Sequence, residues 1–399
     1  MKRKLKNFLA PKTIAVIGAS SNEGKVGYTL MKKLSEFRGK IIPINPKYRE
    51  IFGKKTYPSL HEYPGKIDLA VIAIPAESVN HAVEDCARKK IKNVIVISAG
   101  FSEIGKKETE RELLATARKN KINLLGPNCF GIANPSLNLD TTFANSSANK
   151  GNIAFISQSG ALWSYIADLK LETGFSGFVS LGNMADLGFT DFIRYFNKDK
   201  NTKKIILYIE RLKHGKEFIK ACKKSRKEII AVKGGRTSEG NQALISHTGS
   251  LATDFAIYRG ALKQAKVKLV NSLAEALGIE TEFPKLKKGK TTIVTNAGGA
   301  GALITDYLIQ QGIQTQQPID ILGTATPEDY KKTITELKSF SNIVVVLTPQ
   351  SMSNPEATAK ILADSKYKKK ITAFFLGEKS MAKAKNILKA AGIPCFTKI

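Results

Sequence analysis

Short, uninterrupted apolar runs alternate with helical patterns along this chain, and the alternation constrains the fold more than any other sequence feature. A strand that is apolar on both faces must be covered on both faces, as in a parallel sheet flanked by crossover helices. The alternation restarts twice, near residues 150 and 290. The sequence therefore predicts an α/β protein made of three consecutive doubly wound units.

The predicted elements can be assigned to each unit by residue range. The first unit has strands over 13–17, 40–44, 68–74, 93–97 and 122–125, and helices over 26–37, 78–89 and 106–120. The second has strands over 152–156, 177–181, 204–209 and 228–232, and helices over 161–171 and 190–196. The third has strands over 291–295, 342–347 and 370–376, and a helix over 300–311. A polar stretch over 136–150 and the lysine-rich run over 285–290 separate the units.

The chain is long and strongly basic. Its 399 residues are too many for one ordinary domain, and 63 basic against 34 acidic residues give a net charge of +29. The basic excess is spread over several segments and forms no long tail. We interpret it as dispersed surface charge with local pockets for phosphate groups, and we expect no nucleic-acid partner.

Cysteine and histidine usage is unremarkable for a reducing compartment. The four cysteines form no CxxC pair and the four histidines form no ligand pair, so no metal site is predicted. No apolar run approaches the ~18 residues that a membrane helix needs. We therefore expect a cytoplasmic protein that does not contact a membrane.

The first strand-to-helix turn has the composition of a phosphate-binding loop. It reads GASSNEGKVG over residues 18–27, in which small residues allow close backbone approach and Ser20, Ser21 and Lys25 add donors. The spacing matches neither a Walker A loop nor GxGxxG. After the second strand comes Lys47, where an NAD site would place an acid; a cation there suits the extra phosphate of NADP or coenzyme A. An ordinary turn without a ligand remains the alternative.

Three further strand ends of the first unit carry small residues or free backbone groups. They are Ile74-Pro75, Ser98-Ala99-Gly100 and the GPNC segment that contains Asn128. Because the carboxyl ends of parallel strands meet at one edge of a sheet, these segments together predict a crevice for an extended, nucleotide-like ligand.

The second unit opens with a candidate anion site. Ser157, Gln158, Ser159 and Gly160 lie between a predicted strand and a predicted helix, so backbone N–H groups, hydroxyls and the positive helix end would surround one point. The rival interpretation is the GxSxG nucleophile elbow of a serine hydrolase, but Ser157 stands where that motif requires glycine.

His247 lies in the segment SHTGSLA, which predicts a flexible, solvent-reachable loop. A neutral imidazole there can attack phosphorus if a carboxylate holds its other nitrogen. Glu210, at the end of the strand KKIILYIE, is the candidate carboxylate, because strand ends converge on one crevice. Alternatively, Glu210 pairs with Arg211 or Arg236.

Taken in order, the motifs resemble a known family. GASSNEGKVG, NPK, AIP, SAGF, GPNC, ISQSGAL, LGNMAD, YIE and SHTGSLA are similar to motifs of the α subunit of ADP-forming (NDP-forming) acyl-coenzyme A synthetases, relatives of succinyl-coenzyme A synthetase. The similarity runs through NAGGAG at 296–301 and the segment 320–330. It implies a Rossmann-like CoA-binding domain over residues 1–130 and two flavodoxin-like ligase domains over 148–284 and 289–399, the first carrying a phosphohistidine loop.

The resemblance also implies a reaction of the acetate–CoA ligase type. Acyl-CoA, ADP and phosphate would be interconverted with carboxylic acid, CoA and ATP through acyl phosphate and phosphohistidine. Coenzyme A would be a substrate, and the acid would be acetate or another short or branched one. No ATP-grasp pattern or other ADP site is visible in the sequence, so ADP, ATP and Mg²⁺ are expected mainly on an ATP-grasp β subunit, in an α2β2 assembly.

Roles carried over from the family fall on named residues. His247 would be phosphorylated, with Glu210 as its partner, and phosphate would bind at Ser157, Gln158, Ser159 and Gly160. Coenzyme A would contact Gly18, Ser20, Ser21, Lys25, Val26, Gly27, Lys47, Ile74, Pro75, Ser98, Ala99, Gly100 and Asn128.

This sequence departs from the family pattern in two places. The family usually continues beyond the segment matching GIPCF at 392–396, and Ala300 stands where proline is common. A second function stays open at this point, that of a non-catalytic CoA-binding regulatory protein of the same superfamily, in which the histidine is commonly lost.

Overall fold

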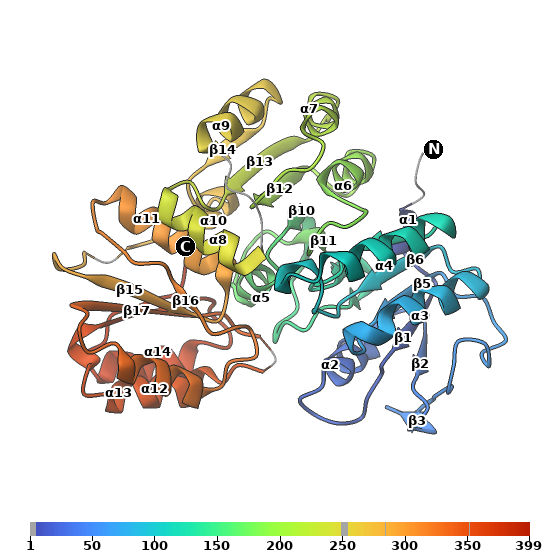
Figure 1. Ribbon diagram of the computed structural model, residues 1–399, viewed down its shortest axis with the longest axis horizontal. Coiled ribbons are helices and arrows are strands. Elements are labelled where there is room, and N and C mark those ends of the chain that lie inside the picture. Colours follow the sequence, from blue (N-terminus) through green and yellow to red (C-terminus); the bar gives the residue numbers. More distant parts are fainter. Residues whose placement is uncertain (1–4, 249–253, 284, 351) are drawn as a thin grey trace.

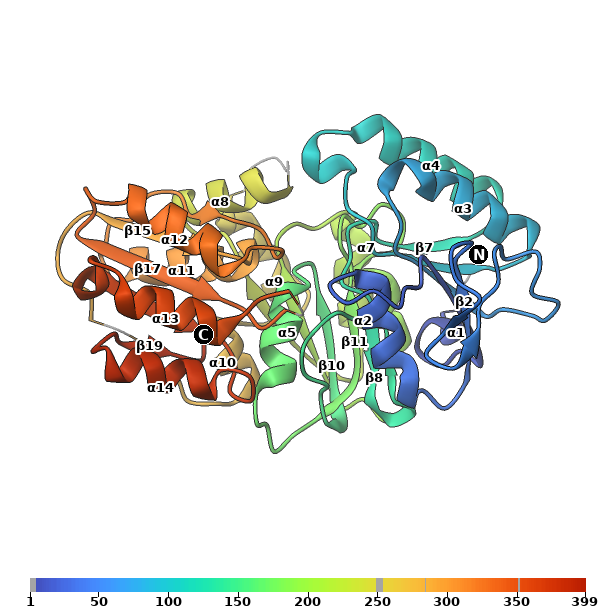
Figure 2. The ribbon, with the colours of Figure 1, turned by 90° about the horizontal axis from the view of Figure 1, so that it is seen from below.

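Three mainly parallel sheets form three α/β domains, and the second domain lies between the other two (Figures 1 and 2). The computed structural model describes residues 5–248, 254–283, 285–350 and 352–399, with the backbone alone for 245–248. The predicted α/β class is confirmed. No helix among the described residues is long and apolar enough to cross a membrane.

The first domain has a Rossmann-like sheet. Its parallel strands are β2 (Lys40–Ile44), β1 (Thr13–Ile17), β5 (Leu69–Ile72), β6 (Asn93–Val96) and β7 (Asn123–Leu125), in that spatial order. A parallel bridge between Ile44 and Tyr57 adds a rudimentary strand outside β2. Counting that bridge, the order becomes 3-2-1-4-5-6, the usual Rossmann order.

The remaining elements of the first domain are helices and a hairpin. They are α1 (Lys6–Leu9), α2 (Val26–Lys33), η1 (Leu34–Glu36), the hairpin β3 (Glu50–Ile51) and β4 (Lys54–Lys55), α3 (Ala76–Arg88), η2 (Ser102–Ile104) and α4 (Lys107–Lys119). The three long helices α2, α3 and α4 follow β1, β5 and β6 respectively, as crossover connections require.

The second domain has a flavodoxin-like sheet with an antiparallel extension. Its strands, in spatial order, are β14 (Lys268–Val270), β13 (Glu228–Lys233), β12 (Lys204–Ile209), β10 (Lys150–Ser157), β11 (Phe175–Ser180), β8 (Ile132–Asn134) and β9 (Leu139–Asp140). The five parallel strands read 2-1-3-4-5 from β11, the flavodoxin order. The polar stretch over 136–150 is thus partly built into this sheet, through β9 and the turn η3 (Pro135–Leu137).

The helices of the second domain connect its parallel strands or follow them. They are α5 (Ala161–Asp168), α6 (Phe189–Phe196), α7 (Gly215–Lys223), α8 (Ser238–Thr248), α9 (Phe255–Gln264) and α10 (Leu273–Leu277).

The third domain repeats the flavodoxin order. Its sheet runs β16 (Ile319–Asp320), β15 (Thr291–Thr295), β17 (Asn342–Leu347), β18 (Ile371–Phe375) and β19 (Cys395–Phe396), all parallel. Its helical segments are α11 (Gly298–Gln310), α12 (Pro327–Glu336), α13 (Pro355–Asp364), η4 (Lys368–Lys370) and α14 (Ala382–Ala390). The edge strands β14, β16 and β19 were not predicted, because two or three residues show no periodicity.

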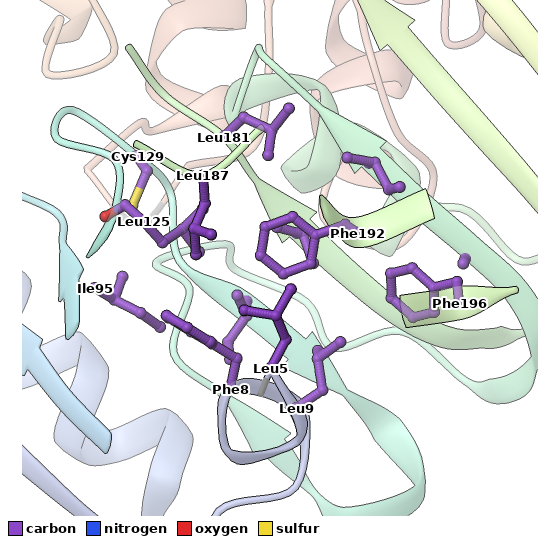
Figure 3. Close-up of a cluster of buried hydrophobic side chains, with 14 of the residues drawn as sticks. Leu5, Phe8, Leu9, Ile95, Leu125, Cys129, Leu181, Leu187, Phe192 and Phe196 are labelled. Carbon is purple, nitrogen blue, oxygen red and sulfur yellow. The ribbon is translucent and has the colours of Figure 1, made fainter. Parts of the chain in front are cut away.

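Two apolar cores cross domain boundaries and fix the three sheets relative to one another. In the first, Phe8 of α1 lies between Ile95 of the first sheet and Phe192 of α6, and Leu9 of α1 belongs to the same core (Figure 3). In the second, side chains around Trp163 of α5 are continuous with those of α11, β17 and β18. Because the domains share cores, residues from all three can be held around one cavity.

Candidate functional site

One cavity, of about 1190 Å³, lies where the carboxyl ends of the three sheets face each other. This is where ligands bind in open α/β sheets. The predicted site residues that line it are Gly18, Ser20, Lys25, Val26, Gly27, Lys47, Ile74, Pro75, Ser98, Ala99, Asn128, Gln158, Ser159, Gly160 and Glu210. The structure therefore brings the first-domain loop, the second-domain turn and Glu210 together around one space.

Two glycines make the first loop compact. A Cβ on Gly27 would lie 1.9 Å from the carbonyl oxygen of Gly18, and a Cβ on Gly18 would lie 2.3 Å from the carbonyl oxygen of Ala73. Gly18 also has a φ of +90°, which favours glycine. The N-terminus of α2, which begins at Val26, can therefore pack directly on the end of β1.

Hydroxyls and cations surround this loop. The Ser20 Oγ accepts a hydrogen bond from the Asn22 N–H at 2.9 Å and lies 3.5 Å from the Tyr48 hydroxyl. The serine hydroxyl contacts, with the nearby charges of Lys47 and Lys25, lower the pKa of Tyr48. Sequence reasoning missed Tyr48, whose only signal is its position directly after the NPK motif. Ser21 is exposed and does not line the cavity.

The ends of β5 and β6 are joined by a serine. The Ser98 hydroxyl donates to the Ile74 carbonyl oxygen at 2.5 Å and accepts from the Ile74 N–H at 3.2 Å. Ser98 therefore aligns the two strand ends in the cavity wall. Gly100, also predicted as a CoA contact, donates its N–H to the Glu103 carboxylate and is not a lining residue.

An asparagine pair connects the first and second domains at the cavity. Asn128 Nδ2 donates to Asn183 Oδ1 at 3.2 Å, and both residues line the cavity. Asn183 Nδ2 in turn lies 2.6 Å from Glu103 Oε2 and 2.7 Å from Glu110 Oε2. Asn183 was not predicted as a site residue, although it lies in the LGNMAD motif.

The second-domain turn is shaped by its own side chains. The Ser157 hydroxyl is buried and donates to the Ser159 carbonyl oxygen at 2.6 Å, so it supports the turn and does not line the cavity. Gln158 Oε1 accepts from the N–H groups of Glu210 and Arg211, at 2.8 and 2.9 Å. Ser159 and Gly160 line the cavity at the start of α5, whose free N–H groups favour an anion.

The third domain closes the cavity with the N-terminus of α11. Ala297 and Gly298 line the cavity, and a Cβ on Gly299 would lie 2.7 Å from the Ser159 Cβ and Oγ. The Tyr208 hydroxyl donates to the Gly299 carbonyl oxygen at 3.2 Å. The predicted helix start at residue 300 was wrong by two residues, because α11 begins at Gly298, directly before the Gly299 that packs on Ser159.

Two charged residues lie at the ends of neighbouring strands. Glu210 follows β12, is 9% exposed and lines the cavity. Lys233 ends β13, is 1% exposed, and its Nζ lies 4.6 Å from the Tyr258 ring centroid. Burial lowers the pKa of Lys233 to about 8, although the negative charges of Asp306 and Glu210 act to raise it. Lys233 was not predicted, since the strand pattern does not show that its amine is buried.

His247 lies in a helix and not in the predicted loop. Its backbone belongs to the last turn of α8, while its side chain is outside the described part of the structure. The structure thus places the helix that carries this histidine but leaves its predicted contact with Glu210 as a prediction. Within the described residues, no three His, Cys, Asp or Glu side chains gather as a metal site.

Comparison with known proteins adds two family models. A CoA binding domain matches residues 12–135, and a succinyl-CoA ligase like flavodoxin domain matches residues 150–281. These matches cover the first loop and the second-domain turn respectively.

Relatives match nearly the whole chain. The α subunit of ADP-forming acetate–CoA ligase II from Pyrococcus furiosus is 38% identical, over 98% of this chain and 93% of its own. The ADP-forming acetate–CoA ligase of Methanocaldococcus jannaschii is 42% identical over 82% of this chain, which spans only 50% of that protein. The dinucleotide forming acetyl-coenzyme A synthetase 1 of Ca. Korarchaeum cryptofilum, solved with phosphate and ADP, has a TM-score of 0.66 and 32% identity, covering 99% of this chain and 94% of its own. The chain therefore belongs to the family of ADP-forming acetate–CoA ligase α subunits.

Proposed function

We propose that this chain is the α subunit of an ADP-forming acyl-CoA ligase that interconverts acyl-CoA, ADP and phosphate with acid, CoA and ATP. The observation that carries the proposal is the single cavity shared by the first-domain loop, the Ser159-Gly160 turn and Glu210. A ligand long enough to contact the first loop can place its other end at the turn within the same space.

Coenzyme A fits the first-domain part of this cavity. Gly18 and Gly27 keep the start of α2 close to the end of β1, which makes the loop compact. The exposed Lys25 and Lys47 supply cations for the phosphate groups. The pantetheine arm would then extend past Ser98 and Asn128 toward the second domain. Both residues line the same cavity.

Phosphate fits the start of α5. Bound at the N–H groups around Ser159 and Gly160, a phosphate oxygen would attack the thioester carbonyl carbon. The carbon–sulfur bond breaks, coenzyme A leaves as a thiolate that takes a proton from solvent, and an acyl phosphate remains. The same backbone donors would stabilise the oxyanion that forms during the attack.

His247 would take the phosphoryl group in the second step. A ring nitrogen attacks phosphorus, the bond from phosphorus to the acyl oxygen breaks, and the carboxylate leaves. Glu210 would hold the other ring nitrogen and offset the imidazolium charge. The phosphohistidine then passes its phosphoryl group to ADP.

The site for ADP would lie on a partner. The sequence shows no ATP-grasp pattern or other ADP site, and the relative from Pyrococcus furiosus is named as a subunit alpha. This chain spans only 50% of the Methanocaldococcus jannaschii ligase, so that single-chain relative has room for further domains. We propose an ATP-grasp β subunit as the partner, with Mg²⁺ accompanying the nucleotide, in an α2β2 complex that acts in the cytoplasm.

Labelling with ³²P-phosphate tests the proposal. The complex with the partner subunit is incubated with acetyl-CoA and labelled phosphate, and base-stable, acid-labile label on this chain is measured. We expect label on the unsubstituted chain and on the His214→Ala control, an exposed histidine outside the cavity, but none on His247→Ala. Equal labelling of the His247→Ala chain would contradict the proposal, and CoA binding without any label would favour the regulatory alternative.

A further inference from the structure

Asp306 is a buried carboxylate on α11 that bonds to the second domain. It is 3% exposed, and it does not line the cavity. Its Oδ1 accepts from the N–H groups of Arg236 and Thr237, both at 2.9 Å, and from the Thr237 hydroxyl at 2.8 Å. Its Oδ2 lies 2.9 Å from the same Arg236 nitrogen. A carboxylate suits this place because it accepts on both oxygens and donates nothing.

The groups that Asp306 holds form the start of α8. Thr237 precedes the helix, its carbonyl oxygen accepts from the Asn241 N–H at 2.9 Å, and its hydroxyl accepts from the Gly240 N–H at 3.1 Å. Thr237 is therefore the N-cap residue. A Cβ on Gly240 would lie 2.2 Å from Asp306 Oδ1, so α8 and α11 approach closely only because residue 240 is glycine.

The same turn is also tied to the second sheet. The Arg236 side chain donates from Nε to the Lys233 carbonyl oxygen at 2.9 Å and from Nη1 to Asn271 Oδ1 at 2.6 Å. It also donates from Nη2 to the Val270 carbonyl oxygen. The start of α8 is thus held from one side by its own domain and from the other by Asp306 of the third domain.

The position of the start of α8 determines where the other end of the helix lies. His247 lies ten residues after Thr237, about 15 Å along the helix at 1.5 Å per residue. Cα atoms of α8 lie within 8 Å of η2 in the first domain, so the helix reaches from the third domain to the first (Figure 2). A small change of angle at Thr237 would therefore be enlarged at the histidine.

We propose that Asp306 is a positioning residue for phosphoryl transfer, which clamps the start of α8 to the third domain and so sets the place of His247. This role rests on the proposed function of His247. The two oxygens of Asp306 are occupied by the turn, so the residue acts through α8 and does not touch the substrate.

Three variants of the full chain, in complex with the partner subunit, test the clamp. Asp306→Ala removes every bond to the turn, Asp306→Asn keeps the shape but replaces one acceptor oxygen, and Thr237→Val removes the hydroxyl alone. The Asp306→Ala complex should lose at least tenfold in the rate of ³²P labelling from acetyl-CoA and phosphate. The exchange of labelled CoA into acetyl-CoA, which reports acyl phosphate formation, should stay within twofold. The labelling rates of Asp306→Asn and Thr237→Val should lie between those of Asp306→Ala and the unsubstituted complex.

Hydrogen exchange supplies a readout that does not depend on activity. Amides of residues 240–244 should exchange at least tenfold faster in Asp306→Ala, while those of β12 and β17 stay protected. If the alanine variant does not fold, Thr237→Val decides the question by the same measurement.

Asp168 offers a matched control. It is fully buried at the end of α5 and also joins the second and third domains, accepting from the Glu378 and Ser380 N–H groups at 2.9 and 3.0 Å. It is not among the residues that hold the α8 turn. Asp168→Asn should therefore leave the exchange of residues 240–244 and the labelling rate within twofold of the unsubstituted complex.

Each result bears on the clamp. Faster exchange with slower labelling and unchanged CoA exchange supports it. Unchanged exchange at 240–244, unchanged labelling, or an equal loss of every step overturns it. Absence of label on the unsubstituted complex would contradict the proposed function and with it the role in transfer, whereas the exchange comparison would still decide whether Asp306 holds α8.

Discussion

Lys233 shows how packing sets the chemistry of one side chain. Its Nζ donates to the Gly234 carbonyl oxygen and lies over the Tyr258 ring, yet burial lowers its pKa from 10.5 to about 8. The apolar strand ending in a lysine is visible in the sequence. Its burial is not, because the groups around its amine come from distant parts of the sequence: the Tyr258 ring belongs to α9, and Asp306, whose charge acts on the amine, belongs to α11.

The lowered pKa makes stability depend on pH in a definite direction. Between pH 8 and 10.5 the unfolded chain holds a proton on Lys233 that the folded chain has lost, so stability rises with pH across this window. For this residue alone, the free energy of unfolding should therefore be about 2 kcal/mol larger at pH 9.5 than at pH 7. Denaturant unfolding of the unsubstituted protein and of Lys233→Met at both pH values isolates that term. An identical pH dependence in the two proteins would show that Lys233 titrates normally.

At the scale of elements, the sequence predicts long helices and strands well. It predicts poorly the short elements that form only through contacts with distant parts of the chain. Five parallel strands of the first domain follow from their apolar runs, since a buried strand needs such a run. By contrast, β8 pairs with β11 and β9 pairs with β8, through contacts that no local pattern encodes. The segment around His247 was expected to be a loop from its Ser, Thr and Gly content. Its backbone is helical as far as Thr248, in a helix whose start is capped by Thr237 and held by Asp306.

The short helix α1 should contribute more stability than its four residues suggest. Phe8 is fully buried between the first and second domains, with its ring centroid 6.2 Å from that of Phe192 (Figure 3). Phe8→Ala should cost about 3–5 kcal/mol through lost burial and the cavity left behind. Phe52→Ala, in the turn of the β3–β4 hairpin and 42% exposed, should cost less than about 1 kcal/mol. Urea unfolding of both variants measures the difference, and equal losses would show that α1 is not part of the core.

At the scale of the whole molecule, the candidate site divides by how locally each part is encoded. The Gly18–Gly27 loop, Lys47 and the Ser159-Gly160 turn were predicted because each follows a strand directly and has the composition its geometry requires. The third-domain wall was missed, because Ala297 and Gly298 reach the cavity only through the docking of α11 against Ser159. Local composition therefore indicates a ligand-binding turn, while the arrangement of domains decides which turns share a ligand.

The net charge of +29 separates into a general and a local contribution, and these predict different responses to salt. Dispersed lysines attract any polyanion weakly and are screened beyond about 8 Å at physiological ionic strength. Lys25 and Lys47 line the cavity and should hold the phosphates of coenzyme A directly.

Replacing either Lys25 or Lys47 by glutamine should raise the Kd for CoA about fivefold, or about 1 kcal/mol, and should weaken the dependence of that Kd on NaCl. Replacing Lys368 and Lys369, which are exposed in η4 and outside the cavity, should change neither by more than about twofold. Calorimetric titration of CoA at 50 and 500 mM NaCl measures both quantities, and a similar loss in the two sets of variants would mean that the net charge, and not the cavity, attracts the ligand.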